Sequence, residues 1–134
     1  EGQLGTDDVF AADLQALRPH PGQAASAENL RKVMAGSPIR DSHRDPDACT
    51  RVQDAYSLRC SPQVHGSARD TCEHAALVAG RELAAAVDNP VVTLDGRVES
   101  NGNFHGAPVA HVLDFLAVVT ADVATRSVEF ERVS

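Results

Sequence analysis

Residues 62 to 87 carry the pattern that most narrows the possible fold of this chain. Small apolar side chains recur there at steps of four, four and three residues, which is typical of a helix packed along another helix. They are Val64, Ala68, Cys72, Ala75, Ala79, Leu83 and Ala86. A helix over 62–87 would be about 37 Å long, whereas a compact domain of this size has a radius of gyration of about 14 Å. We therefore expect an extended bundle that other chain segments or subunits complete.

Two shorter helices are expected before the long one. Residues 6–17 combine an N-cap candidate, Thr6 or Asp7, with an apolar face. That face consists of Val9, Phe10, Leu14 and Leu17. Residues 22–36 predict a second helix that ends at Gly36, and its apolar stripe holds Ala27, Leu30 and Met34. Residues 36–50 mix proline, serine and charges of both signs, which predicts a mobile surface loop.

A hairpin and a last helix are expected after the long helix. Pro90 disfavours helical geometry at Asn89, so the long helix should end before them. Residues 91–100 predict a β-hairpin with Asp95-Gly96 as a two-residue turn. Residues 108–132 predict a helix, whose apolar face consists of Val109, Val112, Leu113, Leu116, Val119, Val123 and Phe130. The expected fold class is mainly α, a fragment of a long-helix bundle with one short β-hairpin.

The composition limits which partners the protein is expected to bind and where in the cell it is expected to lie. Aromatic residues make up only 4% of the 134 residues, which suits closely packed helices better than a β-sandwich. The net charge of −7 argues against a nucleic-acid partner. The sequence contains no run of 18 apolar residues, so no membrane span is expected. Three cysteines without CxxC spacing predict reduced thiols in a cytoplasmic protein. Because residue 1 is Glu1 rather than methionine, we expect a piece of a longer protein.

The segment "RVQDAYSLRC" carries the strongest candidates for chemistry. On a helix, Gln53, Tyr56 and Arg59 would fall within about 120° of arc and could point into one cavity. An arginine there is suited to a bidentate grip on a carboxylate, and a phenol beside a cation is suited to proton transfer. By spacing alone, a polar helix face with one half-buried tyrosine explains the same residues.

Two further groups have both a functional and a structural interpretation. Cys60, His65, Cys72 and His74 are close in sequence, but their spacing matches no metal-binding pattern, so no metal is expected. In "GNFHG", two glycines flank Phe104 in a way that suggests a tight turn or a close approach to another group. A simple connector between hairpin and helix is the alternative.

Three motifs together resemble the central portion of the aromatic amino acid lyases, and in particular their histidine ammonia-lyase branch. The motifs are "QDAYSLRC" with "PQVHG" one residue later, "AVDNPVV" and "SNGNFHGAPVA". Ser61, between the two parts of the first motif, stands where many members of the family have methionine. The resemblance implies that residues 1–134 form part of the central helical domain of a homotetramer. It also implies a 4-methylideneimidazol-5-one electrophile, which forms from an internal Ala-Ser-Gly. This sequence has no Ala-Ser-Gly, and the nearest string is Ala25-Ser26-Ala27.

The resemblance also implies roles for five residues of a composite active site. Arg59 corresponds to the residue that holds the substrate carboxylate, and Tyr56 to a catalytic phenol beside the electrophile. Gln53 corresponds to a polar support in that site. Asn89 resembles an asparagine that assists carboxylate or water binding, and Phe104 resembles a ring that packs near the electrophile.

The implied activity is the non-oxidative elimination of ammonia from L-histidine to give urocanate, with the isolated 134 residues inactive. Two alternatives stay open. One is another lyase or aminomutase of the same family, acting on phenylalanine or tyrosine. The other is a helical interaction module without catalysis.

Overall fold

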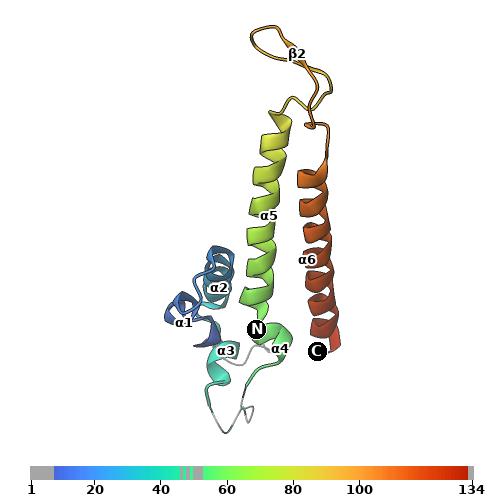
Figure 1. Ribbon diagram of the computed structural model, residues 1–134. Coiled ribbons are helices and arrows are strands. Elements are labelled where there is room, and N and C mark those ends of the chain that lie inside the picture. The colour runs from blue at the N-terminus through green and yellow to red at the C-terminus, as the bar shows by residue number, and fades with distance from the viewer. Residues whose placement is uncertain (1–7, 46, 48, 50–52, 133–134) are drawn as a thin grey trace.

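Two long antiparallel helices form the axis of the computed structural model, and shorter helices gather at one end of them (Figure 1). The structure describes residues 8–45, 47, 49 and 53–132, with side chains described up to Arg126. The long helices are α5 (Ser61–Leu83) and α6 (Ala107–Arg132). A two-stranded antiparallel sheet, β1 (Val91–Val92) and β2 (Val98–Glu99), stands at the far end. The mainly α fold with one short hairpin is confirmed.

The α5–α6 pair confirms that the small apolar repeat is a helix-packing surface. Ala75 on α5 and Val112 on α6 are buried where the two helices meet. However, α5 ends at Leu83, so the predicted end at residue 87 is wrong and Ala86 lies outside the helix. Past Leu83 the described part of α6 offers no further turn for α5 to pack against, and helix propensity alone rarely sustains a helix without tertiary contacts.

The second packing surface of α5 lies near its start, where α2 (Pro21–Met34) crosses it closely. A Cβ atom on Gly22 would lie 2.2 Å from the carbonyl oxygen of Gly66, so only glycine fits at this crossing. The backbone N–H of Gly22 donates to Asp70 Oδ1 at 2.8 Å. Helix α2 confirms the second predicted helix, and Gly36 has a positive φ of 72°, as expected of a helix stop.

A buried apolar cluster joins α2 to the segment before it and consists of Phe10, Ala27 and Met34, with Val9 and Leu30 packed against it. Phe10 belongs to the 3-10 helix η1 (Asp8–Phe10), which is followed by the short helix α1 (Ala12–Ala16). The predicted single helix over 6–17 is therefore wrong, and Thr6 and Asp7 lie outside the described residues.

The apolar face predicted for that first helix is also only half correct. Leu14 and Leu17 are exposed, whereas the polar Gln15 is buried. Gln15 Nε2 donates to the carbonyl oxygen of Val9 at 3.0 Å, and Gln15 Oε1 accepts from Gln23 Nε2 at 2.8 Å. Because these bonds satisfy the amide, Gln15 turns inward and the two leucines turn out.

Residues 36–50 contain a short helix where a loop was expected. Helix α3 (Pro38–Ser42) begins after Ser37, whose hydroxyl accepts from the backbone N–H of Arg40 at 3.2 Å. Serine at the N-cap and proline at the first helical position are both standard helix-start signals. The prediction of an irregular loop over the whole of 36–50 is therefore wrong.

The hairpin is confirmed, but its turn differs from the predicted one. Val91 pairs with Glu99 and Val92 with Val98. The backbone N–H of Gly96 donates to the carbonyl of Thr93 at 2.9 Å, and Gly96 has a φ of 84°. The loop is thus a turn over residues 93–96 completed by a glycine with positive φ, the common three-residue hairpin loop.

Helix α6 confirms the predicted last helix, although Phe130 lies outside the described side chains. Val109, Val112, Leu116, Val119 and Val123 are at least partly buried, whereas Leu113 is exposed. Over Ala107–Arg126 the helix is also long and apolar enough to cross a membrane by length and composition alone, with a mean hydropathy of 1.5. No uninterrupted apolar run marks this segment, because polar residues that include His111, Asp114 and Asp122 divide it.

Candidate functional site

Arg59 lies at the end of helix α4 (Tyr56–Arg59), a single turn that precedes α5. Its Nη1 donates to Oε1 of Gln53. Its Nε is buried and has no hydrogen-bond partner among the described residues. A half-buried guanidinium with one side held by an amide and an unused N–H donor is suited to bind a carboxylate.

Gln53 does not lie on the helix with Tyr56 and Arg59, so the predicted single helical face is wrong. Gln53 stands three residues before α4 begins, in a segment without regular structure. The side chains of Gln53 and Arg59 nevertheless meet. A hydrogen bond joins Gln53 to the guanidinium of Arg59.

Tyr56 opens α4, and 58% of its surface is exposed. Leu58, two residues on, is almost fully buried and fixes α4 to the rest of the chain. The guanidinium carbon of Arg126, on α6, lies 5.0 Å from the centre of the Tyr56 ring. That distance is within the range of a cation–π interaction. No local sequence pattern marks this contact, because Arg126 is 70 residues away along the chain.

Asn89 and Phe104 lie in the segments that join the hairpin to α5 and α6. Asn89 Oδ1 accepts from the backbone N–H of Asn101 at 2.9 Å, and Asn101 Nδ2 donates to the carbonyl of Asp88 at 3.0 Å. These bonds tie together the entry to the hairpin and the exit from it. Phe104 is 60% exposed. Asn101 was not singled out from the sequence, although asparagine is a frequent partner of nearby backbone groups in turns.

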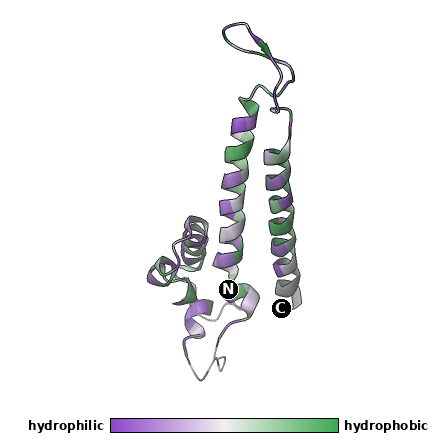
Figure 2. Ribbon diagram, viewed as in Figure 1, coloured by the Kyte–Doolittle hydropathy of each residue, from purple (hydrophilic) through white to green (hydrophobic). Residues whose placement is uncertain are grey.

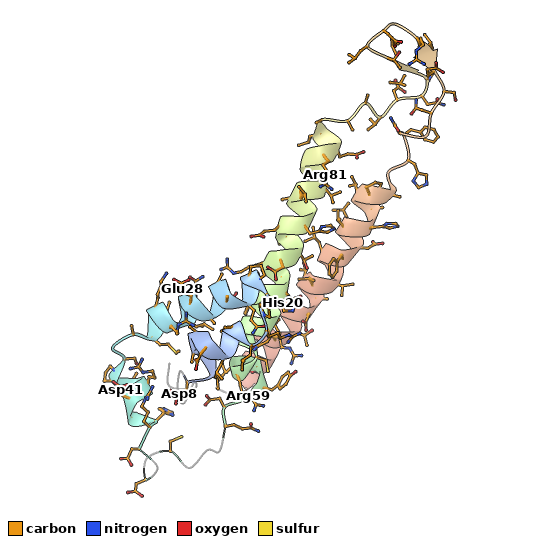
Figure 3. The ribbon with its side chains drawn as sticks, turned by 60° about the vertical axis from the view of Figure 1, so that its left-hand side comes forward. Asp8, His20, Glu28, Asp41, Arg59 and Arg81 are labelled. Carbon is orange, nitrogen blue, oxygen red and sulfur yellow. The ribbon has the colours of Figure 1, made fainter. Side chains whose placement is uncertain are left out.

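The structure therefore divides the predicted site residues into two clusters. We call Gln53, Tyr56 and Arg59 the arginine cluster, and Asn89 with Phe104 the hairpin cluster. Helix α5, which separates them, has 23 residues and is about 34 Å long. Figure 3 labels Arg59 at the start of α5 and Arg81 near its end, where the hairpin segment begins. Within one chain, the two clusters cannot contact the same small substrate.

No group of three or more histidine, cysteine, aspartate and glutamate side chains that could hold a metal ion is found within the part of the chain that the structure describes. A cavity of about 370 Å³ lies between α2, α5 and α6. Arg18, His20, Asp70 and His74 are among its lining residues, whereas neither predicted cluster contributes to it.

Comparisons with known proteins place this geometry in a family. The family model for aromatic amino acid lyases matches residues 1–131. Histidine ammonia-lyase of Streptomyces griseus is 67% identical over 125 residues, which cover 93% of this chain and 24% of that protein. The chain thus spans about a quarter of the length of the curated relatives that it matches.

Solved structures share the arrangement of the helices. Histidine ammonia-lyase from Trypanosoma cruzi is 36% identical with a TM-score of 0.74, over 95% of this chain and 22% of that one. Tyrosine aminomutase from Streptomyces globisporus is 33% identical with a TM-score of 0.78, over 93% of this chain and 27% of that one. The match to the family model over almost the whole chain, together with these likenesses, shows that the chain belongs to the aromatic amino acid lyase family.

Proposed function

We propose that this chain is the central part of a histidine ammonia-lyase, which eliminates ammonia from L-histidine to give urocanate. The observation that carries the proposal is the arginine cluster, in which Gln53 holds Arg59 and the buried Nε of Arg59 has no partner among the residues that the structure describes. The identity of 67% to the Streptomyces griseus histidine ammonia-lyase favours histidine over the substrates of the related aminomutases.

In this reaction the Cα–N bond breaks and a proton leaves Cβ, so that a carbon–carbon double bond forms and ammonia departs. Arg59 binds the substrate carboxylate and fixes the orientation of the amino acid, which is the condition for a selective elimination. The phenol of Tyr56 lies one helical turn before Arg59 and takes part in the proton transfer. Asn89 and Phe104 contribute a polar contact and an apolar wall.

The family's 4-methylideneimidazol-5-one electrophile, when present, makes the substrate's amino group a better leaving group. The 134 residues contain no Ala-Ser-Gly from which that group forms, so they do not fit the electrophile itself. We propose that another segment of the complete subunit supplies it. Incubation of the 134-residue chain alone with L-histidine should then produce no urocanate absorbance above a blank.

The separation of the two clusters leads us to propose a composite site in a homotetramer. Because about 34 Å of α5 separates the clusters, each active site takes the arginine cluster from one subunit and the hairpin cluster from another. Helix α6 has exposed apolar side chains available for such an assembly, including Leu113, Phe115 and Val118. Figure 2 shows hydrophobic residues along both long helices. Light scattering on the purified 134-residue chain should detect dimers or larger species.

Steady-state kinetics of two variants of the complete enzyme test the assigned roles. Arg59→Ala removes a charge-assisted pair with the substrate carboxylate worth about 1.5–3 kcal/mol, so substrate binding should weaken roughly tenfold to hundredfold. Tyr56→Phe keeps the ring and removes only the hydroxyl, so turnover should fall by about 10² with little change in KM. Circular dichroism confirms that both variants fold. A folded Tyr56→Phe enzyme with unchanged turnover would reduce Tyr56 to a packing residue.

A further inference from the structure

Little within α4 itself fixes the orientation of the Tyr56 ring. The helix has only four residues, its N-cap residue Ala55 makes no side-chain capping bond, and more than half of Tyr56 is exposed. Leu58 anchors the backbone of α4 but points to the core rather than to the ring. If the phenol of Tyr56 is to be held at a reacting proton, a contact from another element must fix its ring.

Arg126 provides such a contact from α6, which packs against α4. Its guanidinium carbon lies 5.0 Å from the centre of the Tyr56 ring, and a cation attracts an aromatic face at this distance. The side chain of Arg126 is three-quarters buried, and its Nε lies 3.7 Å from Oδ1 of Asp122, one helical turn earlier. Asp122 and Arg126 thus form an ion pair within one long helix.

We propose that Arg126 is a positioning residue, which holds the ring of Tyr56 in the orientation that proton transfer requires. Arg126 does not touch the substrate in this role, because it lies over the ring and acts through Tyr56. The catalytic consequence rests on the proposed lyase function, whereas the contact between the two side chains does not. The proposal therefore needs one test without activity and one with it.

The chain is suited to a direct test because Tyr56 is its only tyrosine and it has no tryptophan. The near-ultraviolet circular dichroism band of tyrosine in the 134-residue chain thus reports on Tyr56 alone. We expect Arg126→Leu to remove most of this band and Arg126→Lys to retain it, because lysine keeps a cation near the ring. Arg81→Leu, at the far end of α5, is the matched control and should leave the band unchanged. An unchanged band in a helical Arg126→Leu chain would overturn the proposal.

Kinetics of the complete lyase supply the second test. Arg126→Leu should lower kcat about tenfold to hundredfold with little change in KM, since a displaced catalytic group slows the chemical step. Arg126→Lys should restore most of that loss. In a Tyr56→Phe background, Arg126→Leu should have no further effect, because the hydroxyl that it positions is already gone. Wild-type kcat in Arg126→Leu, or additive losses in the double variant, would overturn the positioning role.

The two tests separate this proposal from the proposed function. If the tyrosine band responds to Arg126→Leu but the complete protein does not convert L-histidine, the lyase assignment fails and the contact stands. If the complete protein converts L-histidine but Arg126→Leu changes neither kcat nor the band, the positioning role fails and the lyase assignment stands.

Discussion

The two ends of α5 differ in how their surroundings hold them. At its start, α5 packs against α2 and α4, and the helices at this end bury the side chains of Phe10, Met34 and Leu58. At its end, the chain continues into a hairpin whose larger apolar side chains are exposed, including Val92, Leu94 and Phe104. There, hydrogen bonds from Asn89 and Asn101 hold the segments together instead of a core.

This difference indicates which parts of the proposed active site the chain can organise without help. The arginine cluster has in-chain contacts, since Arg59 donates a hydrogen bond to Gln53 and Arg126 lies over Tyr56. The hairpin cluster has polar bonds that shape its backbone, but Phe104 has no core to pack into. We infer that contacts within this chain hold the arginine end, whereas Phe104 at the hairpin end becomes packed only when other segments or subunits cover it.

The largest expected effect is on the free energy of unfolding, when one phenylalanine at each end of α5 is replaced in turn. Phe10 is fully buried, so Phe10→Ala should lower the free energy of unfolding of the chain by about 3–5 kcal/mol. Phe104 is mostly exposed, so Phe104→Ala should change it by less than about 0.5 kcal/mol. Urea denaturation followed by far-ultraviolet circular dichroism measures both. Similar losses in the two variants would remove the distinction between a packed end and an open one.

A second comparison uses two glycines of α5 itself. A Cβ atom on Gly66 would lie 2.4 Å from backbone atoms of Gln23, so Gly66→Ala should destabilise the chain by about 1–3 kcal/mol. Gly80 has nothing within 4 Å of the same added atom. Gly80→Ala should therefore stabilise the chain by up to about 1 kcal/mol, because alanine favours a helix over glycine. Thermal unfolding measures both variants. Midpoint temperatures that shift in the same direction would contradict the prediction.

The smallest effect concerns the pH dependence of the hairpin. A hydrogen bond from the Thr93 hydroxyl, followed by one from Arg97, lowers the pKa of the Asp95 carboxyl below its ordinary value. Because the folded-state pKa is the lower one, this stabilisation is complete above the ordinary pKa of aspartate and is lost as pH falls through the lowered value. Amide chemical shifts of residues 93–97 should therefore change on acidification. Asp95→Asn, which cannot titrate, should remove that change, and its persistence in the variant would assign the transition elsewhere.

Features that depend on local sequence were predictable to a large extent. The heptad repeat predicts α5 and its packing on α6, and the glycine at residue 36 predicts the stop of α2. Errors arose where a tertiary contact overrides the local pattern. Gln15 turns inward because Val9 and Gln23 satisfy its amide. Helix α5 ends at Leu83, soon after it has passed the first turn of α6 (Figure 1).

For the site, the sequence motifs identify the residue types but not their distances. The resemblance names Tyr56, Arg59 and Asn89, and the helix predicted over 62–87 already implies that Asn89 lies far from the other two. The contact of Arg126 with Tyr56 joins residues from two elements that pack together only in the folded chain. The local sequence does not predict such a contact, because neither the periodicity of the last helix nor the residues that flank Arg126 distinguish it.

The composite site is tested most directly by mixing subunits of the complete enzyme. One subunit carries Arg59→Ala, which disables the arginine cluster, and the other carries Asn89→Ala, which disables the hairpin cluster. If each site takes the two clusters from different subunits, random hybrid tetramers should regain activity at about a quarter of their sites. Each variant alone, refolded in the same way, is the control and should stay impaired. Hybrids no more active than the two parent variants would contradict the division of the clusters between subunits, because a site built from one subunit always carries one of the two defects.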